Sequence, residues 1–407
     1  MAKIDDSSKK KVPELRFSGF TDDWEERKLG ELTTSFSGGT PSAGNSSYYK
    51  GDIPFIRSGE INRDKTELFL TEAGLKNSSA KMVSVGDILY ALYGATSGEV
   101  GISQINGAIN QAILAIKPYN GYDSHFIMQW LKLQKQKIID KYLQGGQGNL
   151  SGSIVKDLVL NVPNFEEQQK IGSFFKQLDD IIALHQRKLD LLKEQKKGFL
   201  QKMFPKNGAK VPELRFKGFA DDWEERKLED MKDVRDGTHD SPKYKDEGYP
   251  LVTSKNLTDN GLDLTDVSLI SEEDFNSINQ RSKVDIGDII FGMIGTIGKP
   301  VIIDREDFAI KNVALLKHGG TIENRFLIQL LKSSVFDSYL RKENAGGTQK
   351  FIGLSQIRNF EFLTPSIEEQ QKIGTFFKQL DDTIALHQLN LDFLKEQKKG
   401  FLQKMFV

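Results

Sequence analysis

The feature that most constrains this chain is a long segment that occurs twice. Residues 166–204 and 368–406 are nearly identical and differ at five positions. Neither copy contains proline, and apolar residues recur in the first at alternating intervals of three and four, at Phe175, Leu178, Ile182, Leu189, Leu192, Phe199 and Met203. An apolar repeat sustained over several heptads predicts a coiled-coil helix, which at about 1.5 Å per residue would be about 58 Å long.

Two polar residues interrupt the apolar repeat in each copy. They are His185 and Lys196 in the first and His387 and Lys398 in the second. Polar residues at such positions fix the register of paired helices. We therefore interpret His185 and His387 as register residues and not as catalytic groups.

A second repeat precedes each variable region. Residues 11–29 return as residues 210–228 with two changes, so the chain is an internal duplication of an opening motif, a body and a helix. The first helix continues into the second opening motif, whereas the second helix has no such continuation. We expect a cyclic arrangement in which the end of the second helix packs beside Phe20 and Trp24. The alternative is that the two ends have no partner.

The two bodies are less alike, but they share landmarks in the same order. Each has a Gly-Thr turn, an apolar run after a proline, a Gly-Asp turn into a strand, a glycine-rich turn and a late Gly/Gln loop. Short β-branched runs cut by turn residues predict a mostly antiparallel sheet, and amphipathic helices are predicted at residues 124–142 and 323–342. The predicted fold class is α+β, with two such domains joined by two long helices in an antiparallel coiled coil. The predicted bounds are 1–162 and 207–364 for the domains and 163–206 and 365–407 for the helices.

Composition excludes several classes of protein. The 407 residues are enough for two or three domains. The absence of cysteine excludes disulfides and thiolate metal sites. No apolar run of 18 residues occurs, so we expect a cytoplasmic protein without membrane contact. The net charge of −1 weighs mildly against a stand-alone nucleic-acid binder, but not against one whose partners supply positive surface.

A search for catalytic motifs finds none. Residues 292–299 resemble a phosphate loop, but five residues separate the outer glycines and Pro300 stands where the motif needs Ser or Thr. We expect a strand turn there. The five histidines have no ligand spacing. We therefore expect no catalytic, cofactor-binding or metal-binding residue, and no enzymatic activity.

The loops of the bodies are rich in side chains that contact phosphates and base edges. Their recurrence at matching positions of the two bodies indicates a recognition surface, and the family resemblance given below implies that its ligand is DNA. The candidates in the first body are Thr40, Ser42, Tyr48, Arg57, Thr96, Ser97, Gln147 and Asn149. The candidates in the second body are Thr238, His239, Lys243, Lys255, Thr296, Lys299, Gln349 and Lys350.

Together these motifs resemble one known family. The pattern Pro-x-x-Glu-Glu-Gln-Gln-Lys-Ile at residues 163–171 and 365–373, the two opening motifs and the Gly-Asp-Ile strands are similar to the specificity subunit of type I restriction-modification systems. The resemblance implies that each body is a target recognition domain that reads one half of a bipartite sequence in double-stranded DNA. It also implies that the helices space the domains and dock two methyltransferase subunits, which restriction (motor-nuclease) subunits then join.

The resemblance also implies where the chemistry lies. Members of this family are not catalytic; S-adenosylmethionine belongs to the methyltransferase partner, and ATP and magnesium belong to the restriction partner. One departure is that Arg187 and Lys188 of the first helix become Leu389 and Asn390 in the second. The helices are therefore not expected to present identical faces. The alternative from another class is a coiled-coil scaffold whose paired domains bind proteins, and adjacent methyltransferase and nuclease genes would discriminate against it.

Overall fold

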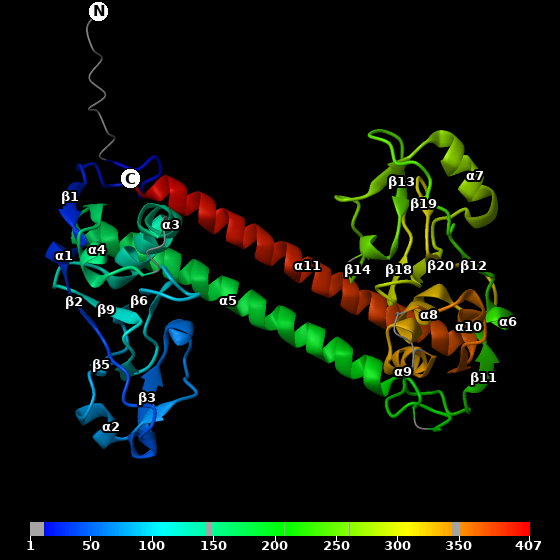
Figure 1. Ribbon diagram of the computed structural model, residues 1–407, viewed down its shortest axis with the longest axis horizontal. Coiled ribbons are helices and arrows are strands. Elements are labelled where there is room, and N and C mark those ends of the chain that lie inside the picture. The colour runs from blue at the N-terminus through cyan, green and yellow to red at the C-terminus, as the bar shows by residue number, and fades with distance from the viewer. Residues whose placement is uncertain (1–11, 144–148, 207, 260, 344–350) are drawn as a thin grey trace, which may run out of the picture. The chain divides into compact units, whose positions relative to one another are not determined.

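The computed structural model describes residues 12–143, 149–206, 208–259, 261–343 and 351–407 (Figure 1). By their contacts the residues form two units, Met1–Gln186 with Leu389–Val407, and Arg187–Gln388. We call them unit 1 and unit 2. Each unit holds one body, the first part of the helix that follows it and the last part of the other helix. The contacts therefore divide each long helix between the units, whereas the predicted bounds keep each helix as one segment.

An antiparallel sheet lies at the centre of the body of unit 1. Its order is β2-β9-β6-β7, with bounds Thr33–Ser37, Ile113–Pro118, Ile88–Ala91 and Val100–Ile102. Successive side chains of a strand point to opposite faces. Accordingly Ile88 and Tyr90 pack with helix α3 (Ser124–Tyr142), while Leu89 and Ala91 pack into a separate cluster. All four side chains are buried.

A smaller sheet covers the second face. Its order is β4-β3-β8-β5, with bounds Phe69–Leu70, Tyr49–Ile56, Gly107–Ile109 and Lys81–Val83. Strands β3 and β8 are parallel, and the other pairs of this sheet are antiparallel. Ile56 and Ile109 from this sheet pack against Leu89 of the central sheet. The shorter elements are β1 (Glu25–Lys28), α1 (Leu29–Leu32), η1 (Ser46–Tyr48), η2 (Ser58–Glu60), α2 (Glu72–Lys76), α4 (Gly152–Lys156) and β10 (Val159–Val162).

Unit 2 repeats this plan with different side chains. Its central sheet, β12-β20-β17-β18, is antiparallel, and its second sheet, β16-β13-β19, again contains one parallel pair. The bounds are β12 Val234–Asp236, β13 Tyr249–Val252, β16 Ser268–Ile270, β17 Ile289–Gly292, β18 Gly298–Ile302, β19 Ala309–Ile310 and β20 Val313–Leu316. The remaining elements are β11 (Glu224–Lys227), α6 (Leu228–Met231), η3 (Ser254–Asn256), β14 (Leu257–Thr258), β15 (Gly261–Leu262), α7 (Glu272–Ser282), α10 (Leu354–Arg358) and β21 (Glu361–Thr364). The predicted α+β class is confirmed.

The helix predicted at residues 323–342 is wrong as a single element. It is two helices, α8 (Asn324–Leu331) and α9 (Ser334–Glu343). The break follows from Ser333, whose fully buried hydroxyl donates to the carbonyl of Leu330 at 2.7 Å and accepts the backbone N–H of Val335 at 3.2 Å. A serine that bonds nearby backbone groups in this way competes with continued helix. In unit 1 the predicted helix is present unbroken as α3.

The two repeated segments form the long helices α5 (Phe165–Lys202) and α11 (Ile367–Met405). Their seam residues Phe175, Leu178, Leu189 and Leu192 are buried. In unit 1 the ring of Phe174 lies 5.2 Å from that of Phe401, and in unit 2 the ring of Phe199 lies 5.0 Å from that of Phe376. In each unit an early residue of one helix meets a late residue of the other, so the pairing is antiparallel.

The end of each helix packs on the opening motif of its unit, as the cyclic prediction requires. In unit 1 the ring of Phe406 lies 6.3 Å from that of Trp24, and the N–H of Leu15 donates to the carbonyl of Lys404 at 2.9 Å. Unit 2 has the same contacts at the end of α5, where Phe204 meets Trp223 at 6.3 Å and Leu214 bonds Lys202 at 2.9 Å. The prediction is confirmed.

In each unit an arginine of the opening motif forms a bidentate ion pair with a glutamate at the start of a long helix. Arg16 donates to both carboxylate oxygens of Glu167 at 2.7 and 2.8 Å, and Arg215 does the same to Glu369 at 2.8 Å. Both glutamates are buried. These bonds raise the pKa of Arg16 above its usual value. A bidentate pair of this kind fixes orientation as well as position.

The seam lysines make ion pairs across the helices. Lys398 lies 2.5 Å from Asp179 in unit 1, and Lys196 lies 2.6 Å from Asp381 in unit 2. The Asp179 carboxylate also accepts from Gln129 of α3 at 2.8 Å, and Lys132 of α3 lies 3.8 Å from it. In unit 1 the ion pair of Lys398 with Asp179 therefore joins both long helices to α3 of the body. Among the described residues, no helix is long and apolar enough to cross a membrane.

Replacing Asp179 by alanine should destabilise unit 1. The Lys398 side chain is only 14% exposed, and a buried charge left without its partner costs several kcal/mol. Because Asp179 is about a third exposed, we expect a loss of about 2 kcal/mol. Urea unfolding measures it. Asp180→Ala is the matched control, because its pair with Lys176 is more than half exposed and should contribute about 0.5 kcal/mol or less. Equal losses in the two variants would contradict a register role.

Candidate nucleic-acid interface

In unit 1 several turns converge on the loop at residues 110–112, between β8 and β9. The N–H of Gly39, in the Gly-Thr turn, donates to the carbonyl of Ile109 at 3.2 Å. The N–H of Leu92, at the start of the β6–β7 turn, donates to the carbonyl of Ala112 at 2.8 Å. The ends of β2 and β6 therefore both meet this loop.

Two further segments join the same place. The N–H of Asn110 donates to the carbonyl of Ile56, at the end of β3, at 3.3 Å. Leu150, which follows the Gly/Gln loop, donates to the carbonyl of Leu92 at 2.9 Å, and a β-bridge pairs Asn149 with Tyr93. We call the surface formed by these turns the loop edge of the body.

Unit 2 has the same frame of backbone hydrogen bonds. Thr238 donates to the carbonyl of Ile310 at 3.0 Å, and Met293 donates to that of Asn312 at 3.3 Å. Ile352 in turn donates to the carbonyl of Met293 at 3.0 Å. Both bodies therefore gather the Gly-Thr turn, the hairpin turn and the segment after the Gly/Gln loop on one loop edge.

The structure brings together several of the candidates in unit 1. The hydroxyl of Thr40 donates to the side chain of Gln111, Thr96 and Ser97 lie in the β6–β7 turn, and Asn149 is tied to that turn by its bridge to Tyr93. Ser42 and Tyr48 lie in the segment before β3 and make no such contact among the described residues. Gln147 lies outside the described residues.

Arg57 has partners inside the protein. Its guanidinium donates to Glu60 at 2.8 and 3.1 Å and to Glu67 at 2.7 Å. Burial by itself raises the pKa of Glu60, but the bonds from Arg57 and its neighbours outweigh this and lower it to about 2. At the equivalent turn of unit 2 the uncharged Asn256 takes the place of Glu60 and accepts the N–H of Thr253 at 3.0 Å. Arg57 thus stabilises the turn after β3, and base reading remains a prediction.

The candidates of unit 2 lie on several of the converging turns. Thr238 and His239 are in the Gly-Thr turn, Thr296 lies in the β17–β18 turn, and Lys299 follows it at the start of β18 with a left-handed backbone (φ 52°). A non-glycine residue in this conformation is uncommon. Lys255 lies 3.6 Å from Asp266, and Lys243 is exposed. Gln349 and Lys350 lie outside the described residues.

His239 is held by oxygen atoms on both sides of its ring. Its Nε2 lies 3.0 Å from a carboxylate oxygen of Asp236, and its Nδ1 lies 2.8 Å from the amide oxygen of Asn312. Asp236 also accepts from Arg281 of α7. The contacts with Asn312 and Asp236 raise the pKa of His239. The Gly-Thr turn and α7 border a cleft of about 490 Å³ here.

Sequence reasoning missed the loop at which these turns meet. By their backbone hydrogen bonds Asn110 of unit 1 corresponds to Lys311 of unit 2 and Ala112 to Asn312, so the loop of unit 1 is one residue longer. The Lys311 ammonium donates to the hydroxyl of Ser241 at 2.6 Å. A signal was present, because both bodies contain Ala-Ile followed by two polar residues shortly before or at the start of a strand.

One acidic cluster has metal-like spacing. Asp285, Asp288 and His318 place possible ligand atoms within 4.8 Å of one another. However, the Lys317 ammonium lies 2.7 Å from Asp285 and 2.5 Å from Asp288. Bonds from Lys317 and Lys283 lower the pKa of Asp285 to about 2. Two lysines thus pair with the two carboxylates, and the cluster is a structural ion-pair network of the Gly-Asp turn.

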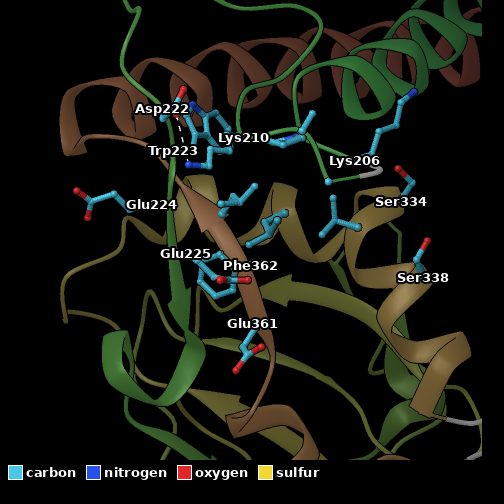
Figure 2. A pocket seen from close by; sticks show the side chains of 16 residues that line it. Lys206, Lys210, Asp222, Trp223, Glu224, Glu225, Ser334, Ser338, Glu361 and Phe362 are labelled. Carbon is cyan, nitrogen blue, oxygen red and sulfur yellow. Dashed lines mark ion pairs between the residues drawn. The ribbon is translucent and has the colours of Figure 1, made fainter.

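A cavity of about 1080 Å³ in unit 2 lies elsewhere. Trp223, Lys210 and the strands β11 and β21 line it, and Figure 2 shows Glu224, Glu225 and Glu361 among its labelled side chains. None of the DNA-binding candidates lines it. Its charged lining is four carboxylates, Asp222 among them, against two lysines, an excess of negative charge that disfavours DNA phosphates, so this cavity is not the predicted DNA site.

The stability contributed by His239 should depend on pH. Its folded-state pKa is raised above 6.5, so its contribution is fully present below about pH 6.5 and is lost as pH rises through the raised pKa. The side chain is half exposed, and we therefore expect less than about 1 kcal/mol. The stability difference between the natural protein and His239→Gln, measured by urea unfolding from pH 6 to 9, should shrink as pH rises. A constant difference would contradict the pairing.

Comparisons with known proteins place this architecture in a family. The model for the "Type I restriction modification DNA specificity domain" matches residues 21–194 and 220–395. The specificity subunit of the type I restriction enzyme MjaVIII of Methanocaldococcus jannaschii is 22% identical over 399 residues, which cover 95% of this chain and 92% of that protein. The MjaIX specificity subunit of the same organism is 24% identical over 409 residues, with 94% and 92% covered.

A solved structure has the same fold. The crystal structure of the type I restriction-modification S subunit from M. genitalium matches with a TM-score of 0.66 at 16% identity, and covers 97% of this chain and 99% of that chain. Since the family model matches most of both repeats, the chain belongs to the family of type I restriction-modification DNA specificity subunits.

Proposed function

We propose that this chain selects the DNA target of a type I restriction-modification complex, with each body reading one half of a bipartite sequence. The observation that supports this most directly is the contrast between its parts. Two bodies with different loop residues keep the same hydrogen-bonded loop edge, whereas the helices between them are almost unchanged. Different loops on the same backbone frame are expected of a protein whose two domains bind the same kind of ligand, DNA, at two different base sequences.

The residues of the loop edges fit base reading. Asn149 and Gln111 belong to the side-chain types that pair with adenine in the major groove, and Lys299 to those that pair with guanine. Thr40 and Ser97 supply hydroxyls that bond either bases or phosphates. Because backbone hydrogen bonds hold these loops in place, the loops lose little conformational entropy when they bind DNA.

The two half-sites are different from one another. The loop edge of unit 1 is largely neutral at its Gly-Thr turn, where Thr40 bonds Gln111, while the corresponding turn of unit 2 has His239 and Asp236. Different donors and acceptors select different bases. The target is therefore asymmetric, with an unread spacer. Half-sites about 34–36 Å apart, one helical turn, would let both bodies meet one face of the duplex.

The remaining activities belong to partners. We place two methyltransferase subunits, which hold S-adenosylmethionine, on the outward faces of α5 and α11. The restriction subunits, which use ATP and magnesium, join this assembly. The chain itself supplies no catalytic group. The alternative of a scaffold that binds proteins through both bodies has no support among the relatives.

Methylome sequencing of the host at single-molecule resolution tests the proposal. We expect a methylated target with two different short half-sites and a fixed spacer, and we expect it to disappear when the gene for this chain is deleted. A continuous target, a palindrome or unchanged methylation after deletion would overturn the proposal.

Loop substitutions should affect one half-site at a time. Thr96→Ala with Asn149→Ala should weaken methylation by about tenfold or more through the first half-site, because each lost base contact costs about 1–3 kcal/mol. Thr296→Ala with Lys299→Ala should act through the second half-site. Methylation rates on DNA with single-base changes in either half measure this. Glu72→Ala on α2, away from the loop edge, is the control and should change nothing. Uniform loss across both halves would remove these loops from the reading surface.

The isolated chain should bind DNA weakly. Its net charge is −1, whereas phosphate contacts from basic residues supply most non-specific affinity. Adding the methyltransferase subunit should raise affinity at least a hundredfold in a fluorescence anisotropy titration at 0.15 M salt. Tight and specific binding by the chain alone would show that it provides its own phosphate contacts.

A further inference from the structure

The five replacements between the helix copies are not scattered. The pairs are Ser173/Thr375, Ile181/Thr383, Arg187/Leu389, Lys188/Asn390 and Leu191/Phe393. All of these residues are outside the buried seam. The first pair exchanges one hydroxyl side chain for another. The other four change polarity or size on the outward surface of the helices.

These four replacements sort by unit. Because each helix passes from one unit to the other, unit 1 contains Ile181 of α5 together with Leu389 and Phe393 of α11. Unit 2 contains the counterparts Thr383, Arg187 and Leu191. In three of the four pairs the more apolar or the larger apolar side chain therefore falls in unit 1, and in the fourth unit 1 has the neutral Asn390 where unit 2 has Lys188. A fourth apolar position is the same in both copies, as Leu184 in unit 1 and Leu386 in unit 2.

The apolar residues of unit 1 lie on one side of the helix pair. With Ile182 and Leu189 at seam position a, Ile181 and Leu184 occupy positions g and c of α5. Leu389 and Phe393 occupy f and c of α11. These positions adjoin one another on a helix, and antiparallel pairing places the g sides of both helices together. The exposed fractions of these four side chains are 45% for Ile181, 64% for Leu184, 67% for Leu389 and 59% for Phe393.

A cluster of large exposed apolar side chains on one face marks an interaction surface. The partner that covers this surface must account for a contrast: the two helix copies agree at 34 of 39 positions, whereas the bodies beside them differ. One kind of partner that meets both copies explains this agreement. Under the proposed function, on which this inference rests, that partner is the methyltransferase subunit.

We propose that the two methyltransferase docking faces are unequal, and that the face of unit 1 binds its methyltransferase subunit first and more tightly. In unit 1 the partner covers Ile181, Leu389 and Phe393, and burial of their apolar surface favours binding. In unit 2 it must remove water from Arg187 and Lys188, which costs free energy unless it supplies matching acceptors. Assembly is therefore sequential, through a complex with one partner held on unit 1.

Exchanging the outward residues tests the proposal with the chain's own side chains. One variant, Ile181→Thr with Leu389→Arg, Asn390→Lys and Phe393→Leu, gives unit 1 the outward residues of unit 2. The reciprocal variant, Arg187→Leu with Lys188→Asn, Leu191→Phe and Thr383→Ile, gives unit 2 those of unit 1. Both keep the seam and use residues already present in these helices, and circular dichroism verifies that each variant is folded.

The full-length chain is titrated with the methyltransferase subunit of its own system in a calorimeter, with native mass spectrometry of each mixture. We expect two binding steps whose dissociation constants differ by at least tenfold, which corresponds to about 1.4 kcal/mol. Hydrogen exchange with half an equivalent of partner should protect Leu184 and Phe393 before Leu386 and Leu191. The first variant should lose the tight step, and the reciprocal variant should convert the weak step into a second tight one.

Three results would overturn the inference. The natural chain could bind two methyltransferase subunits with equal dissociation constants, and neither variant could change them. This result would show that the two faces are equivalent, while the proposed function would stand. Protection of unit 2 before unit 1 would reverse the order. Dimerisation of the chain alone through the unit 1 face, seen by sedimentation and abolished by the first variant, would assign that face to a second copy. If the methyltransferase subunit does not bind at all, the proposed function itself fails.

Discussion

The structure depends on the ion pairs between seam lysines and aspartates of the opposite helix. Lys398 with Asp179 and Lys196 with Asp381 occur once in each unit. An apolar seam alone permits the two helices to slip by a heptad, because every heptad presents the same kind of side chain. A shift of one heptad would leave both lysines without their carboxylates in a half-buried seam, and the cost of such unpaired charges excludes the slipped registers. Two charges per unit thus select one alignment.

The bodies keep their frame while their loops change, because buried polar contacts below the loops are the same. In unit 1 Asp87 of the Gly-Asp turn pairs with Lys117 at 2.9 Å, and in unit 2 Asp288 pairs with Lys317 at 2.5 Å. In unit 1 the pair joins the turn before β6 to the end of β9, and in unit 2 it joins the turn before β17 to the end of β20. The loop edge lies at the opposite ends of these strands, where the frame is made mainly of backbone hydrogen bonds. Loop residues can therefore differ between the bodies while this frame is kept.

Much of this architecture was predictable, because periodicity and repetition report local preferences directly. The heptads predicted both long helices, and the repeated opening motif predicted that Trp24, like Trp223, packs on the end of a helix. The break at Ser333 was not predicted, because it depends on where a buried hydroxyl finds its partners. The pairing of Arg57 with Glu60 and Glu67 was missed because it depends on how the chain folds back after β3. The convergence of turns on residues 110–112 was missed because it joins segments that are distant in sequence, and the Ala-Ile pattern before that loop does not show what the loop contacts.

The division of each long helix between the two units has a consequence for the order of folding. Unit 2 is one continuous stretch of chain, Arg187–Gln388, whereas unit 1 needs Leu389–Val407 as well. Phe406 packs against Trp24 and Phe175, so on the ribosome the core of unit 1 lacks this ring until residue 406 has been synthesised. The body made first is therefore the last to be finished, and its exposed core is the part of the nascent chain most in need of protection from aggregation.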